Sequence, residues 1–118
     1  MLQNQKGLKE FLMELDRIIQ LIIEKKGFDI VIIELKGITN VADYFVLASG
    51  WTPEHLIAIA ENIEKEFEPF REDGRGSKWL SIDYFDIIIH LFTKEAREFY
   101  DLEGFWIKAP QKKIVLTL

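Results

Sequence analysis

One stretch, Trp79 to Phe92, constrains the fold more than any other part of the sequence. Its beginning alternates between apolar and polar residues, as does a strand with one buried face. Leu80 and Ile82 would point into a core, and Trp79, Ser81 and Asp83 would point to the opposite face. The alternation therefore predicts a half-buried strand that carries a tryptophan on its polar side.

A second strand, Ile87 to Phe92, completes a predicted hairpin with the first. It is apolar except for His90, which is typical of a central strand covered on most of both faces. Asp83 and Asp86 flank the turn between the strands, where aspartates usually accept hydrogen bonds from their own backbone. Paired carboxylates can also act as acid and base or bind a cation, but at this position the turn role is favoured.

Helices and further strands are predicted around this hairpin from hydrophobic periodicity and turn residues. The predicted helices are Leu8 to Lys26 with Gly27 as its stop, a second from Thr52 and Pro53 to Phe67, and a third from Thr93 to Leu102 that Gly104 closes. The other predicted strands are Asp29 to Lys36, Asp43 to Ala48 and a short edge strand at Ile114 to Leu116, with a surface loop at 68–78. The short turn at Gly37 to Asn40 makes the first two strands antiparallel neighbours.

The element order is α-β-β-α-β-β-α with a possible C-terminal strand, in one domain that spans residues 1–118. Helices separated by pairs of strands predict an α/β (α+β) fold, with a mixed β-sheet and flanking helices. Three amphipathic helices would cover one face of the sheet fully and leave the other face partly open.

The charge of the chain restricts its partners. The formal net charge is −5, whereas a surface that binds nucleic acid needs clustered Lys and Arg to displace counterions. A basic protein surface suits this charge better, so we expect little direct contact with nucleic acid. Cysteine is absent, which excludes disulfides and thiolate metal sites. With no signal peptide and no membrane-spanning run in the sequence, we expect a cytoplasmic protein.

No catalytic or metal site can be assembled from the sequence. The two histidines, His55 and His90, lack the spacing of paired metal ligands. Gly74 to Lys78 lacks the spacing of a P-loop, and no nucleophile elbow is present. His55 could be a general base or a partner contact, but a solvated helix residue is its ordinary role, and His90 is read as a structural histidine. We therefore predict no cofactor and no catalysis.

Aromatic side chains offer candidate contacts instead. Asp43 precedes Tyr44 and Phe45, and either ring could face the open side of the sheet, where partly exposed aromatics are common interface anchors. The alternative, that both rings belong to the core, stays open. Trp79 is a stronger candidate because its neighbours on the same side of the strand, Ser81 and Asp83, are polar.

An ordered set of motifs resembles the Iojap family, the ribosomal silencing factors. The motifs are Gly37 to Gly50 (Gly-Ile-Thr-Asn-Val-Ala-Asp-Tyr-Phe-Val-Leu-Ala-Ser-Gly), Thr52 to His55 leading into Ile59-Ala60-Glu61, Trp79 to Asp83, Asp86 to Phe92, and Arg97 to Glu103 with Trp106. The resemblance covers about residues 28 to 106. No single piece is diagnostic, but the ordered set is fairly specific.

The resemblance implies a nucleotidyltransferase-like α/β fold that is used without nucleotidyl transfer. It also implies binding to the large ribosomal subunit through ribosomal protein L-fourteen on the inter-subunit face. Docking there would block joining of the small subunit, lower translation when nutrients are short and, in some lineages, assist maturation of the large subunit. The positions that match the family motifs are Asp43, Tyr44, Ser49, Gly50, His55, Trp79, Asp83, Asp86, His90, Arg97, Tyr100, Leu102, Glu103 and Trp106.

Two departures from the family pattern concern loops. Phe85 stands between the two acidic positions of the hairpin, where the family often has glycine. Asp73-Gly74 replaces the usual Glu-Gly pair, with a slightly shorter run to Trp79. Both departures bear on local loop geometry.

We interpret the chain as a binding module that uses the open sheet face. Trp79 and Tyr44 would form the desolvated centre, with Tyr100 as a further contact. The acidic side chains expected to face Lys or Arg of the partner are Asp43, Asp83, Asp86 and Glu95, and His55 and His90 would orient neighbours or line the rim. The alternatives are a residual nucleotidyltransferase, which the missing Asp-x-Asp pair after Ser49-Gly50 opposes, and a homodimeric interaction or large-subunit assembly module.

Overall fold

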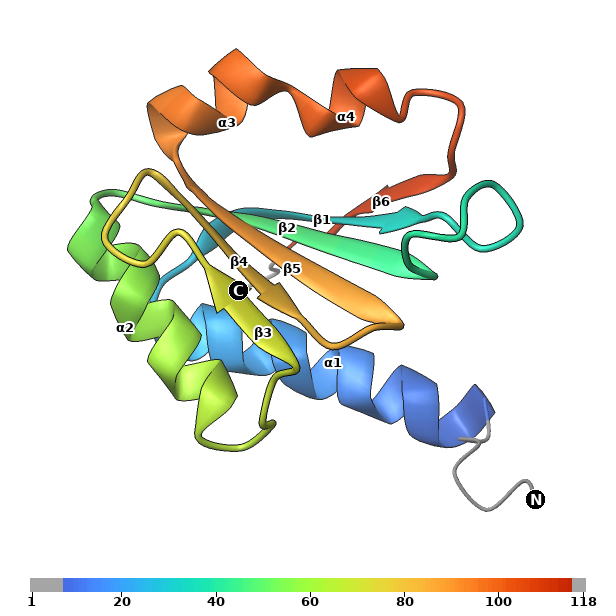
Figure 1. Cartoon of the computed structure of the whole chain (residues 1–118), viewed down its shortest axis with the longest axis horizontal. Coiled ribbons are helices and arrows are strands. Elements are labelled where there is room, and N and C mark those ends of the chain that lie inside the picture. Colours follow the sequence, from blue (N-terminus) through green and yellow to red (C-terminus); the bar gives the residue numbers. More distant parts are fainter. Residues whose placement is uncertain (1–7, 116–118) are drawn as a thin grey trace.

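A mixed β-sheet lies between two layers of helices (Figure 1). The computed structural model describes residues 8–115, with side chains from Glu14 onward. In this part of the chain six strands form one sheet in the order β3-β4-β5-β2-β1-β6. The strands are β1 (Phe28–Glu34), β2 (Tyr44–Gly50), β3 (Arg71–Asp73), β4 (Trp79–Asp83), β5 (Ile87–Thr93) and β6 (Gln111–Lys113). The helices α1 (Leu8–Glu24) and α2 (Pro53–Glu64) cover one face, and the short helices α3 (Lys94–Tyr100) and α4 (Leu102–Phe105) cross the other.

The predicted hairpin is confirmed as the pair β4 and β5. Trp79 lies opposite Phe92, and Ser81 lies opposite His90 in the antiparallel ladder. On its other side β5 runs parallel to β2, and Leu47 is the register partner of His90. Because β5 is paired along both edges and covered on both faces, its apolar sequence is that of a central strand.

Each face of the sheet carries its own core. Toward α1 and α2, the fully buried side chains include Ile22, Val46, Ile59, Ile82 and Ile89. Toward α3 and α4, the buried side chains include Ile33, Leu47, Phe92 and Ala96. The alternation predicted for β4 is therefore confirmed: Leu80 and Ile82 are buried, whereas Trp79, Ser81 and Asp83 are half-buried on the α3 side.

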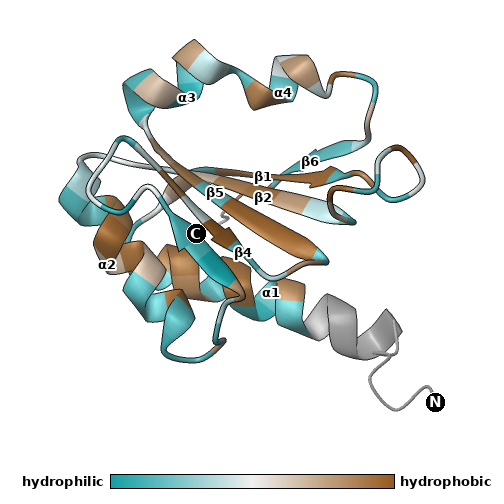
Figure 2. Cartoon of the chain, in the orientation of Figure 1, coloured by the Kyte–Doolittle hydropathy of each residue, from teal (hydrophilic) through white to brown (hydrophobic). Residues whose placement is uncertain are grey.

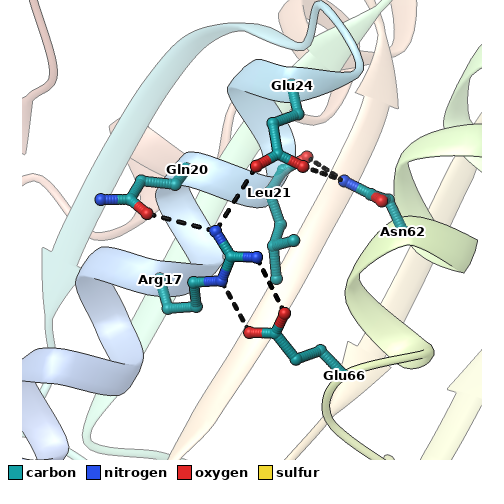
Figure 3. A network of polar contacts seen from close by, with 6 residues as sticks. All are labelled: Arg17, Gln20, Leu21, Glu24, Asn62 and Glu66. Atoms are coloured by element: carbon teal, nitrogen blue, oxygen red, sulfur yellow. Dashed lines mark hydrogen bonds and ion pairs between the residues drawn. The ribbon is translucent and has the colours of Figure 1, made fainter.

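A polar network holds α1 against α2 (Figure 3). Arg17 donates two hydrogen bonds to the Glu66 carboxylate, at 2.7 and 2.8 Å. The buried Asn62 donates from Nδ2 to the carbonyl of Leu21 at 2.9 Å and to Oε1 of Glu24 at 3.2 Å. The Asn62 amide satisfies a carbonyl near the end of α1, so the two helices keep one relative position on the sheet.

Several predicted boundaries are wrong, mainly at the edges of the sheet. The strand β3 lies within the segment 68–78, which the sequence predicts to be a loop. The C-terminal strand is β6, and it ends before the predicted strand Ile114 to Leu116 begins. Leu116 itself lies outside the described residues. Figure 2 shows both edge strands as hydrophilic, whereas the inner strands are hydrophobic. Hydrophobic patterning therefore carries no signal for β3 or β6.

The turns show where backbone conformation is special. After α1, Lys26 and not Gly27 adopts the left-handed conformation, with φ of 67°. Glycine is needed next to it because a Cβ on Gly27 would lie 2.5 Å from Cγ2 of Ile22. In the β4–β5 turn Phe85 has φ of 68°, so it adopts the conformation that favours glycine at this position.

A pair of carboxyl groups joins α2 to the edge strand β3. Glu64 and Glu72 are 21% and 17% exposed, and their carboxyl groups interact. Burial, followed by this contact with Glu72, raises the pKa of Glu64 to about 7. Arg75 donates to Glu72 at 2.8 and 3.0 Å, and its bonds, together with Glu64, hold the pKa of Glu72 below its ordinary value. Glu61 and the phenol of Tyr84 complete the surroundings of the pair.

The unmodified protein should lose stability as the pH rises, and we predict that Glu64→Gln abolishes this loss. Native Glu64 keeps its proton up to a pH of about 7, whereas the unfolded chain loses it near 4.5. The native state binds more protons in that window, so its unfolding free energy falls as pH rises through it, here by about 3 kcal/mol. Urea unfolding of both proteins between about pH 5 and 8 measures the two slopes. Parallel slopes would show that the pKa of Glu64 is not raised in the folded chain.

Candidate protein-binding site

An aromatic cluster surrounds Trp79 at one end of β4. The indole packs against Phe92 of β5 and Tyr100 of α3, with ring centroids 4.9 and 4.6 Å away. Trp79 is half-buried and Tyr100 is 48% exposed. The cluster forms because β4 places Trp79 opposite Phe92 while Thr93 ends β5 and caps α3, which turns Tyr100 back over the sheet. Trp79 and Tyr100 therefore present aromatic edges at the surface, on a rigid base that the buried Phe92 provides.

His90 fixes the orientation of Trp79. The indole Nε1–H donates to His90 Nδ1 at 3.1 Å, so the ring carries its own proton on Nε2. Burial lowers the pKa of His90 to about 4, although nearby Asp83 favours the charged form. A neutral ring is what this bond requires, because a protonated Nδ1 could not accept from the indole. His90 is therefore a buried structural residue beneath the face and not a rim contact.

An acidic hollow lies at the other end of β4. Asp43, Asp83 and Asp86 line it together with the loop between β1 and β2, and its volume is about 360 Å³. The turn role predicted for Asp83 is confirmed, because Oδ1 accepts from the Phe85 backbone N–H at 2.8 Å. The backbone carbonyl of Asp86 accepts from the Asp43 N–H at 2.9 Å, which joins the hairpin to the start of β2. Three predicted carboxylates are thus brought together by the fold.

We call this surface the β4 face: Trp79, Ser81 and Asp83 of β4, with Asp43 and Asp86 beside its end. Trp79 and Asp83 are separated along the strand by about 13 Å, at roughly 3.3 Å per residue. The face therefore combines an aromatic patch at one end with an acidic hollow at the other, on the side of the sheet that α3 and α4 cover incompletely (Figure 1).

Two predicted contacts lie elsewhere. Tyr44 was expected beside Trp79, but it packs with the core under α1 and α2, on the opposite face. Burial, followed by the neighbouring Glu34 and Asp43, raises its pKa. His55 accepts the backbone N–H of Trp51 on Nδ1 at 3.0 Å and donates from Nε2 to the carbonyl of Lys25 at 2.7 Å, so it ties α2 to the end of α1.

The segment from Lys94 to Ile107, which we call the α3–α4 segment, carries exposed side chains that the sequence patterns missed. Phe99, Phe105 and Ile107 are 80%, 75% and 72% exposed. Glu95 lies at the start of α3, 4.0 Å from the Lys78 ammonium group and beside Tyr100. Apolar residues that lie off the buried stripe of a helix are the only sequence signal for such a surface.

Arg97 locks this segment onto the sheet. Its guanidinium is 9% exposed and donates to both carboxylate oxygens of Glu103 at 3.0 Å and to Ser49 Oγ of β2 at 2.8 Å. These bonds, followed by the charge of Arg97, lower the pKa of Glu103 below its ordinary value. Between the two helices Asp101 has φ of 45°, and its side chain accepts from the Gly104 N–H of α4. Tyr100 thereby keeps its place over Trp79.

The arrangement of exposed aromatic rings and carboxylates suits binding. Nowhere among the residues that the structure describes do three His, Cys, Asp or Glu side chains gather so that they could hold a metal ion. No helix in the described part of the chain combines the length and hydrophobicity that crossing a bilayer requires.

Comparisons with known proteins identify the family. The family described as "Ribosomal silencing factor during starvation" matches residues 9–117. Ribosomal silencing factor RsfS of Bacillus subtilis is 33% identical over 97 residues, which cover 74% of this chain and 79% of that protein. A mouse protein, mitochondrial assembly of ribosomal large subunit protein 1, is 28% identical over 102 residues, covering 79% of this chain and 45% of that protein.

A crystal structure of a protein from Chromobacterium violaceum shares the fold, with a TM-score of 0.75 at 23% identity over 80% of this chain and 84% of that chain. The motifs noted in the sequence thus lie within a match that covers nearly the whole chain. The chain belongs to the Iojap family of ribosomal silencing factors, RsfS.

Proposed function

We propose that this chain binds the large ribosomal subunit through ribosomal protein L-fourteen and prevents the small subunit from joining. The proposal assigns it a repressing role in translation, without catalysis. The family supports the ribosomal setting, and the name of the mouse relative refers to the large subunit.

The observation that carries the proposal is the composition of the β4 face. Three aspartates gather at one end of a face that belongs to a chain of net charge −5. RNA phosphates would be repelled by these carboxylates, whereas Lys and Arg of a ribosomal protein would be attracted to them. The structure therefore favours a protein contact on the ribosome over a contact with ribosomal RNA.

Trp79 and Tyr100 would supply the desolvated centre of the contact. Aromatic side chains held in one orientation lose little conformational entropy on binding and are frequent hot spots. The hydrogen bond from Trp79 to His90 and the stack on Phe92 provide that fixed orientation before the partner arrives. Basic side chains of the partner around this aromatic centre would pair with Asp43, Asp83 and Asp86, and Glu95 would extend the acidic rim.

Purified subunits test the proposal. The chain is mixed with separate large and small subunits, and a sucrose gradient then resolves free subunits from joined ribosomes. We expect the chain to sediment with large subunits only and to reduce the fraction of joined ribosomes as its concentration rises. Sedimentation with joined ribosomes, or with small subunits alone, would contradict the proposal. Binding to isolated L-fourteen, measured by calorimetry, tests the assigned partner separately.

Self-association is a second candidate, favoured by the exposed side chains on the α3–α4 segment. Phe99, Phe105 and Ile107 are large apolar residues with most of their surface in solvent, and such surfaces often mediate contacts between copies. A homodimer formed there would lie next to Tyr100 and could compete with a ribosomal partner. Light scattering with and without L-fourteen tests self-association. A dimer that L-fourteen dissociates would indicate that the two partners compete for the same surface. A monomer at all concentrations would exclude self-association.

A further inference from the structure

A second hollow lies on the other side of the β4–β5 hairpin from the acidic hollow of the β4 face. It has a volume of about 520 Å³ and opens between α1, the segment after α2 and the hairpin. Its described lining consists of Glu14, Ile18, Glu66, Phe67, Glu68, Pro69, Phe70, Tyr84, Phe85, Asp86 and Ile87. Phe85 and Asp86 line both hollows, so the hairpin forms the wall between them.

Two exposed phenylalanines that line this second hollow pack against each other at an angle. Phe70 and Phe85 are 62% and 61% exposed, and their ring centroids are 4.3 Å apart. Phe85 occupies a left-handed backbone conformation, with φ of 68°, that disfavours any residue with a Cβ. A phenylalanine therefore stands where the backbone favours glycine, and its ring is in solvent instead of in the core.

The floor of the hollow is preformed. Tyr84 donates its hydroxyl to the Phe67 carbonyl at 2.6 Å, and the two rings meet edge to face at 6.4 Å. The Phe70 backbone N–H donates to the Asp83 carbonyl at 2.9 Å, which fixes Phe70 beside the hairpin. A ligand would thus meet aromatic walls that are already in place, with little ordering left to occur.

The charge of the lining selects a cation. Its described residues include four carboxylates and no Lys, Arg or His. The carboxylate of Glu66 is already paired with Arg17, but Glu68 and Asp86 are exposed at the rim. An aromatic face beside carboxylates is the surrounding that a planar guanidinium prefers, since it can stack on the ring and donate to the carboxylates together.

We propose that this hollow binds an arginine side chain in a basic segment of a partner protein. The guanidinium would lie against the Phe70–Phe85 pair and donate to Glu68 or Asp86. The site adjoins the β4 face and shares Asp86 with it, and its existence does not depend on the ribosomal assignment. Because the hairpin separates the two hollows, one basic chain that crosses the hairpin could occupy both.

The test uses a short peptide, acetyl-Gly-Gly-Arg-Gly-Gly-amide, with the matched peptide in which citrulline replaces arginine. Amide chemical shifts of the full-length protein are followed by NMR during each titration. We expect saturable shifts at residues 66–70 and 84–87 with the arginine peptide and none with the citrulline peptide. Shifts spread evenly over the acidic surface, or equal binding of both peptides, would overturn the proposal.

Phe85→Gly is the decisive variant because glycine suits the backbone there, so the variant should fold at least as well. We expect the arginine peptide to bind it about threefold more weakly or worse, as loss of a cation–π contact predicts. Phe105→Ser, which removes an even more exposed ring outside the hollow, should leave the affinity unchanged. Unchanged binding to Phe85→Gly would overturn the assignment. So would concentration-dependent shifts at the same amides without peptide, because a second copy of the chain would then be the occupant.

Discussion

Replacing Arg97 by leucine is expected to lower the free energy of unfolding by about 3 kcal/mol, because a buried ion pair would lose one member. The change leaves Ser49 Oγ, which is 1% exposed, without its donor, and leaves the Glu103 carboxylate beside an apolar side chain. It also removes the polar link from α3 and α4 to β2, although the apolar contacts of Ala96, Leu102 and Trp106 with the sheet remain. Unfolding in guanidinium chloride, followed by tryptophan fluorescence, measures the decrease in the free energy of unfolding.

The matched control is Arg71→Leu. The pair between Arg71 and Asp73 is equally short, at 2.9 Å, but its side chains are 63% and 61% exposed, so we expect a change within about 0.5 kcal/mol. Replacing Arg97 and Glu103 together by leucine should restore part of the stability that the single change removes. Equal effects of Arg71→Leu and Arg97→Leu would show that burial does not strengthen the pair.

The pH dependence of the same variant has a defined sign. The pKa of Glu103 lies below its ordinary value of 4.5 in the folded chain, so the native state binds fewer protons than the unfolded state in acid. The stabilisation is therefore present above that ordinary value and is lost as the pH falls through the folded pKa. Arg97→Leu should show a shallower loss of stability in acid than the unmodified protein.

The sequence predicted the interior of this fold better than its edges. The alternation in β4 and the apolar run in β5 identified the hairpin, because burial of one or both faces leaves a pattern in the residues. The edge strand β3 consists of Arg-Glu-Asp and buries little, so no hydrophobic pattern marks it. Its position follows from backbone pairing with β4, which only the folded chain shows.

The candidate site was predicted in part for the same reason. Polar partners on one strand placed Trp79 and Asp83 on a common face, and the turn placed Asp86 near them. For Tyr44 the pattern was ambiguous, because β2 is buried on both sides and either Tyr44 or Phe45 could face α3. The pairing of Tyr44 with Ile87 decides it, since Ile87 belongs to the core under α1 and α2. The sequence placed His55 in the first turn of the second helix, but not its role, because one of its two backbone partners, the Lys25 carbonyl, lies 30 residues away in the sequence.

The largest effect on binding is expected from Trp79→Ala, which should weaken association with the large subunit about 30-fold or more. Removal of a central aromatic anchor costs roughly 2 kcal/mol or more, and this variant also removes the nearest ring contact of Tyr100, at 4.6 Å. Affinity is measured by co-sedimentation at a series of subunit concentrations. Trp51→Ala is the matched control: Trp51 is 65% exposed and packs on Phe28 of β1, with β5 and β2 between β1 and β4, so its loss should leave affinity unchanged.

A half-buried tryptophan also supports the fold, so a second variant has to separate binding from stability. Asp86→Lys changes an exposed charge at the acidic hollow and should leave the thermal midpoint nearly unchanged. Charge reversal there should weaken binding about three- to tenfold at low salt, and the difference should shrink as salt screens the interaction. If a folded Trp79→Ala protein binds like the unmodified chain, Trp79 is not the anchor. If Asp86→Lys is also unchanged at low salt, the partner contacts a surface other than the β4 face, and the exposed phenylalanines on the α3–α4 segment become the next residues to change.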